Sequence, residues 1–228
     1  MKTLCVAVVV LSLISVCPAA SLACQKLLEP VDTDPDISGT WHFIAVSTKY
    51  CWVSTIINVL FWPSIAVDVT AKDTPNIYDA NVKFKVYGKC VNESTSLHYA
   101  NHNLFKANSN NAPTGEADVL LQTGCPDCVV VKVVDVITIL ALFSRRKIVD
   151  AAELKEFETQ AQCLGWSKPL VLNTDHDYEN CISLDDAKID MKVGTTFFTK
   201  MYDRVESMYH KLNECFKDTV LAYLPTSK

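Results

Sequence analysis

The sequence predicts an all-β fold, a meander or barrel of short strands, with one flanking helix and one C-terminal helix. Between Gly39 and Arg146, eight β-rich runs alternate with turn signals, a pattern typical of meanders and barrels. A capped segment with one apolar stripe follows at 150–165, and a longer stripe at helical spacing occupies 195–224. The 228 residues are enough for one barrel-sized domain with a single core.

The predicted strands share high β propensity and end at Gly, Pro, Asn or Asp. They are 39–47, 64–71, 81–88, 90–99, 103–107, 116–123, 128–135 and 136–144.

Alternation along a strand predicts which side chains face the interior, because successive residues point to opposite faces. Val82, Phe84 and Val86 alternate with lysines and are expected inside. The sequon at Asn92 places that residue outside if it carries a glycan, which turns the odd-numbered residues of its strand inward. These inward residues are Glu93, Leu97 and Tyr99.

The same reasoning applies to the later strands. Asp118 and Gln122 are expected outside, leaving Val119 and Leu121 inside, and Lys132 leaves Val131 and Val133 inside. An eight-stranded barrel either fills its interior with side chains or holds a small ligand, and these residues fit both outcomes. If a ligand binds, Tyr99 would help to fix its orientation, and Glu93 is the candidate carboxylate for a cationic group.

The first long connection, 50–63, is strongly apolar, whereas loops are usually polar. It is either a short helix or strand packed over the open end of the barrel, or a ligand portal lined by Trp52, Phe61 and Trp62.

The segment after the strands begins with Asp150 followed by Glu153, which predicts a capped helix. Leu154, Phe157 and Ala161 form its apolar stripe, and Gly165 ends it. Residues 169–172 predict one short additional strand.

Residues 1–23 have the features of a secretory signal peptide, with Lys2, an apolar run and small residues up to Ala23. The sequence therefore predicts a secreted, extracellular protein. The net charge of −5 argues against nucleic acid as a partner. Eight of the ten cysteines lie after the predicted cleavage site, which indicates a disulfide framework with up to 105 pairings.

Several motifs resemble the lipocalin family. Gly39-Thr40-Trp41 matches the start of the first lipocalin strand, and Arg145 matches the basic residue that covers that Trp. The runs Gly88-Lys89-Cys90, 152–164 and 178–181 are similar to the α1-acid glycoprotein branch, which includes apolipoprotein M and the fish proteins that bind tributyltin, saxitoxin or tetrodotoxin. The resemblance implies an eight-stranded antiparallel up-and-down barrel over about 24–184, followed by a helical extension at 185–228.

The resemblance also implies two disulfides, Cys24 with Cys163 and Cys90 with Cys181. Cys51, Cys125, Cys128 and Cys215 have no such guide. Cys215 needs one of Cys51, Cys125 or Cys128 as its partner, and the other two can form a second bond. Of the three we expect Cys51, which would tie an amphipathic helix at 195–224 beside the apolar first connection.

We find no catalytic motif and predict no enzyme, cofactor or metal site. Cys125-Pro126-Asp127-Cys128 has the CxxC spacing of redox and zinc sites, but it lies outside the βαβ context of redox motifs and lacks a second ligand pair.

The leading hypothesis is a monomeric secreted carrier that binds a small hydrophobic or amphipathic ligand, such as a lipid, steroid, xenobiotic or toxin, without stable insertion into membranes. The alternatives are an immune or acute-phase protein that acts through its outer surface, and an enzyme that uses a free thiol at Cys51.

Overall fold

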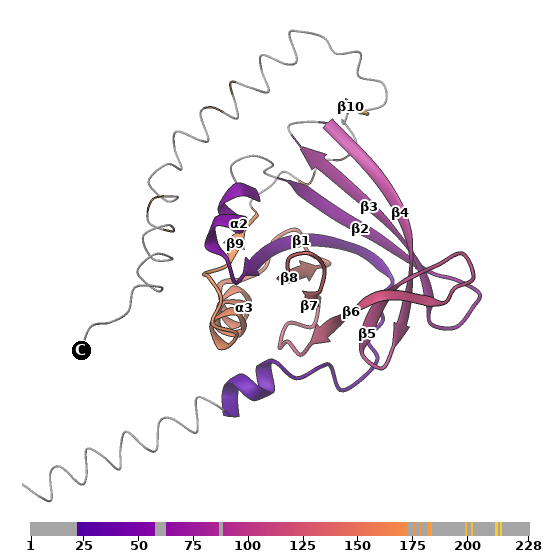
Figure 1. Cartoon of the computed structure of the whole chain (residues 1–228), viewed down its shortest axis with the longest axis horizontal. Coiled ribbons are helices and arrows are strands. Elements are labelled where there is room, and N and C mark those ends of the chain that lie inside the picture. Colours follow the sequence, from indigo (N-terminus) through magenta and orange to yellow (C-terminus); the bar gives the residue numbers. More distant parts are fainter. Residues whose placement is uncertain are drawn as a thin grey trace, which may run out of the picture.

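Eight antiparallel strands form a closed barrel in the computed structural model (Figure 1). The structure describes residues 22–57, 63–86, 89–172, 176, 178, 182–183, 199, 202, 213 and 215. Each barrel strand pairs with the next, and β8 pairs with β1 while β4 pairs with β5, so the ring is complete. The strands are β1 Gly39–Thr48, β2 Ser64–Ala71, β3 Ile77–Val86, β4 Lys89–Ala100, β5 Asn103–Ala107, β6 Pro113–Leu121, β7 Cys128–Val133 and β8 Ile139–Ser144.

The remaining elements lie outside the ring. They are α2 Cys51–Ile56, α3 Ala151–Cys163, β9 Leu170–Val171 and β10 Ile182–Ser183. No helix among the described residues is long and apolar enough to cross a membrane.

All eight predicted strands are present, and β2 and β5 have the predicted bounds. The prediction for β3 began too late, because Ile77 pairs with β4 and Tyr78 to Ala80 pair with both β2 and β4, although polar Asp79 interrupts the apolar pattern. Residues 134–138 form a loop rather than the end of β7 and the start of β8, and the Val134 amide donates a hydrogen bond to the Asp118 side chain instead of to a strand.

One end of the barrel is closed by Trp41, as predicted. The indole is 6% exposed and donates a hydrogen bond to the Ile37 carbonyl at 2.8 Å. The Arg145 guanidinium lies 4.3 Å from the indole ring centre, a cation–π contact, and donates to the Asp36 carbonyl. Gly39 has a φ of 102°, and a Cβ there would run into Arg145, so a residue without a side chain is required.

Beneath α3 the barrel wall is apolar on both sides. Inside, Trp41, Leu120 and Val131 belong to one buried cluster. Outside, buried residues of the wall pack against Phe157 and Ala161 of α3, which covers this side of the barrel (Figure 1).

The predicted inward orientation of Val119 and Leu121 is wrong. Both belong to the outer cluster beneath α3, whereas Leu120 points inward opposite Val131. The error arose because polar residues were assumed to face outward. On β6, α3 shields the outer face from water, so this face is apolar. The polar residue of the strand, Asp118, therefore lies on the inner face.

Helix α3 begins as predicted. The Asp150 side chain accepts a hydrogen bond from the Glu153 amide, and the Glu153 side chain accepts one from the Asp150 amide, a capping box. The chain leaves the helix at Gly165, whose φ is 68°. The predicted additional strand is also present, since β9 pairs with Ala45 and Val46 of β1.

Three described disulfides match the expected pairings. Cys24 is bonded to Cys163, Cys51 to Cys215 and Cys125 to Cys128. Cys90 is also disulfide-bonded, and its expected partner, Cys181, lies outside the described residues.

The predicted signal peptide lies almost entirely outside the described residues, which begin at Leu22. Of the predicted helix at 195–224, the structure describes Thr199, Tyr202, Asn213 and Cys215, all in helical conformation. Cys215 is buried and bonded to α2, so the tie between the extension and the first connection is confirmed.

Phe157 should be the main anchor between α3 and the barrel, because its ring is 1% exposed within the outer cluster. We expect Phe157→Ala to lower the free energy of unfolding by about 3–5 kcal/mol. Denaturation with urea would measure this loss. Ile148→Ala, at an aliphatic side chain that is 80% exposed, is the control and should change stability little. Equal effects of the two substitutions would contradict the assigned packing.

Candidate ligand-binding site

The barrel interior contains an apolar cavity of about 170 Å³ above the Trp41 floor, here called the lower chamber. Its walls come from seven of the eight strands, all but β3, and from the segment before β1. The lining residues are Ile37, Trp41, Val67, Val69, Leu97, Leu104, Asp118, Leu120, Val129, Val131, Val133 and Phe143. Asp118 is the charged residue in this set, and apolar side chains make up the rest.

A larger cavity of about 480 Å³, the upper chamber, adjoins the lower chamber at Asp118 and Val133, which line both. It is polar: Lys106, Thr114, Glu116 and Asp135 also contribute to its walls. The Lys106 ammonium lies 4.0 Å from the Asp135 carboxylate. The interior therefore changes from apolar to polar along the barrel axis.

Strand register shows that the upper chamber lies toward the open end. Val133 pairs with Ile139, and Ile139 pairs with Thr48 at the end of β1, opposite the end at which Gly39 begins. The β7–β8 loop and α2 therefore leave the barrel at the same end. We call this end the mouth.

The predicted inward residues fall into two groups. Leu97, Val131 and Val133 line the lower chamber. Val82 and Phe84 lie on the same inner face, because they pair with Val67 and Ile65 of β2, and Val86 follows them at the mouth. These residues are half-buried and belong to the wall on the β3 side.

Glu93 is not the cavity carboxylate. It pairs with Val82 on the inner face but is exposed, and it is absent from the described lining of both chambers. Asp118 takes that place. Its carboxylate is half-buried and accepts a hydrogen bond from the Val134 amide at 2.8 Å.

Burial raises the pKa of the Asp118 carboxyl above its ordinary value, although the Val134 hydrogen bond and Lys106 act in the opposite direction. Asp118 was expected outside, because the tertiary contact that satisfies its carboxylate comes from the β7–β8 loop and leaves no direct signal in the sequence. A polar residue within an apolar run, two positions before a buried leucine, is the one feature that could have suggested it.

Tyr99 points inward as predicted, but it lies deep in the inner cluster with a 4% exposed side chain. Burial, followed by the nearby Asp34 carboxylate, raises the pKa of its phenol to about 12. Tyr99 is therefore neutral at physiological pH and contributes to the floor rather than to the described chamber walls.

The described part of the apolar first connection contains the short helix α2. Val53 is buried, whereas Trp52 is 36% exposed, with its ring 6.1 Å from that of Tyr50. Trp52 therefore lies at the mouth and outside the described chamber walls. Phe61 and Trp62 lie outside the described residues.

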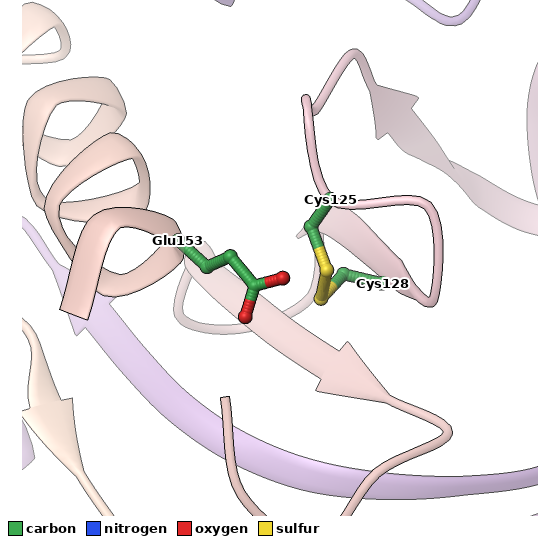
Figure 2. A group of neighbouring side chains, drawn as sticks. All are labelled: Cys125, Cys128 and Glu153. Carbon is green, nitrogen blue, oxygen red and sulfur yellow. A yellow bond between two sulfur atoms is a disulfide. The ribbon is translucent and has the colours of Figure 1, made fainter. Parts of the chain in front are cut away.

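The two cysteine sites considered for metal binding, redox chemistry or nucleophilic attack both contain disulfides. Cys125, Cys128 and Glu153 offer donor atoms within 4.8 Å of one another. The two sulfurs are bonded to each other, however, as Figure 2 shows. A disulfide sulfur is not a thiolate, which is the form that binds metals or attacks substrates. The same holds for Cys51, bonded to Cys215, so the structure offers no thiol nucleophile there.

Asn92 is exposed on β4, as glycosylation of its sequon would require.

Known proteins that resemble this chain are found among solved structures. No protein-family model matches the chain, and no curated protein matches it. Among solved structures it is similar to a siderocalin, Ex-FABP, whose description states that it functions through dual ligand specificities. That match has 12% identity and a TM-score of 0.48, over 60% of this chain and 90% of the other. It is also similar to the odorant binding protein OBP1, with 11% identity and a TM-score of 0.49, over 64% of this chain and 99% of that one.

The raised pKa of Asp118 leads to a pH-dependent prediction. Stability should fall as pH rises from the ordinary carboxyl pKa through the raised one, because the folded protein binds this proton more tightly than the unfolded chain. Asp118→Asn keeps an acceptor for the Val134 amide but cannot ionise. We expect the variant to be at least as stable as the wild type at about pH 7, and to lose that advantage at about pH 3.

Urea denaturation at the two pH values measures this difference. A variant that is clearly less stable at neutral pH would show that the ionised carboxylate stabilises the fold.

Proposed function

We propose that this protein is a secreted, non-enzymatic carrier of the lipocalin type, which binds one small amphipathic molecule inside the barrel. The observation that carries the proposal is the pair of adjoining chambers, apolar at the floor and polar toward the mouth. A barrel whose side chains filled the interior would have no such space. Concave, mostly apolar cavities with a few polar groups are the usual form of small-molecule sites.

The lower chamber would supply most of the affinity. Burial of apolar ligand surface contributes roughly 25 cal/mol per Å². Because this chamber measures about 170 Å³, it suits a compact apolar group better than a long extended chain. The closed Trp41 floor limits how deeply that group can enter.

The upper chamber would orient the ligand. Asp118 lies where the two chambers join, so a hydrogen-bond donor or cationic group on the ligand would meet its carboxylate just above the apolar part. Such a contact would also offset the cost of burying the ionised carboxylate. Among the ligand classes considered, this favours molecules with a polar head, including xenobiotics and toxins, over wholly apolar steroids and lipids.

Secretion is supported by the predicted signal peptide and by the disulfides, which form in oxidising compartments. Membership of the lipocalin family is supported by the motif residues Gly39, Trp41 and Arg145, whose contacts close the barrel floor. We further propose that the carrier acts as a monomer and binds no nucleic acid.

Neighbouring residues on β7 provide a matched test. Val133 lines both chambers, whereas Lys132 points to the outer face. We expect Val133→Trp to obstruct the junction of the chambers and weaken binding of an apolar fluorescent probe at least about tenfold. Lys132→Trp, with the same added bulk outside, should bind the probe like the wild type.

Native mass spectrometry of protein taken from its source should in addition detect a retained small molecule. Equal binding by both variants, with no retained molecule, would refute the carrier function and favour a protein that acts through its outer surface.

A further inference from the structure

The mouth carries large apolar side chains that the fold leaves in water. On the β7–β8 loop, Val136 is 96% exposed and Ile137 is 37% exposed. On the connection beside it, Tyr50, Trp52 and Ile56 are 43%, 36% and 37% exposed. Because Thr48 of β1 pairs with Ile139 of β8, these two segments emerge next to each other. We call these five residues the mouth rim.

The form of the mouth rim fits a lipid surface better than a protein partner. A stable protein interface buries about 800 Å² on each side in a continuous, complementary patch. The mouth rim instead consists of five exposed side chains on two short adjacent segments, and a fluid bilayer surface can adapt to these. Tyr and Trp are enriched at membrane interfaces, since their rings combine an apolar body with a polar atom.

Charge at the mouth points to the same partner. The chain has a net charge of −5, but Lys49, Lys85 and Lys89 all lie where strands end at the mouth, with Asp135 on the β7–β8 loop. The Lys49 ammonium lies 5.9 Å from the centre of the Tyr50 ring, so positive charge and aromatic surface occur together. Lysines beside apolar projections are the combination that binds anionic lipid headgroups.

We infer that the mouth rim docks reversibly on anionic lipid surfaces, with Val136 as its most protruding contact. In this orientation the mouth faces the lipid, and an amphipathic molecule can pass between the bilayer and the chambers with little exposure to water. The inference goes beyond the carrier function, and vesicle binding can be measured independently of ligand binding.

Flotation of the full secreted chain, with its disulfides intact, tests the inference. The probes are vesicles of phosphatidylcholine alone and of phosphatidylcholine with phosphatidylglycerol. Val136→Asp is compared with Ile148→Asp, because Ile148 is 80% exposed but follows β8 at the closed end of the barrel. Neither side chain contributes to packing, so both variants should fold normally.

We expect the wild type to float with the anionic vesicles and less with the neutral ones. Val136→Asp should lower this partition about tenfold or more, and Ile148→Asp should leave it unchanged. Absence of wild-type flotation, or equal loss in both variants, overturns the inference. A wild type that binds the fluorescent probe in solution but ignores vesicles refutes docking alone, whereas one that floats but binds no probe refutes the carrier function alone.

Discussion

Closure of the sheet is the constraint on which the other features depend. The ring of eight strands leaves no barrel strand without a neighbour, and it creates an inside that is separate from the outside. β1 shows how closure is completed. Its first half pairs with β2, and its second half, which has left β2, pairs with β9 at Ala45 and Val46. A strand from beyond α3 thus completes the wall near the mouth, and Leu170 and Leu172 add apolar contacts there.

Much of this architecture could be predicted from the sequence because the determinants are local. Turn residues and apolar alternation located the strands, and the Asp150 capping box located α3. Gly39, Trp41 and Arg145 were identified through a family resemblance, and their contacts agree with it. The pairing of Cys51 with Cys215 was reached by a physical argument, that a long apolar stripe must be covered.

The candidate site was harder to predict because its determinants are tertiary. Alternation of apolar and polar residues separates the two faces of a strand, but it does not show which face another element covers. On β6 the helix α3 covers the outer face, which reverses the usual rule and brings Asp118 inside with Leu120. The Asp118 carboxylate can lie there because the Val134 amide, distant along the chain, donates a hydrogen bond to it. Glu93 fits the same alternation pattern, but among the described residues no amide donates to its carboxylate, and its side chain is exposed to water.

The contact between Arg145 and Trp41 at the barrel floor determines when the interior cavity can form during folding. Gly39 and Trp41 stand at the start of the barrel sequence, whereas Arg145 follows its last strand. A chain still lacking β8 has neither a sealed bottom nor a closed ring, so nothing can yet hold a ligand. Contacts between such distant residues also slow folding. The interior cavity therefore exists only in the finished barrel, so a molecule bound there could not guide the early pairing of the strands.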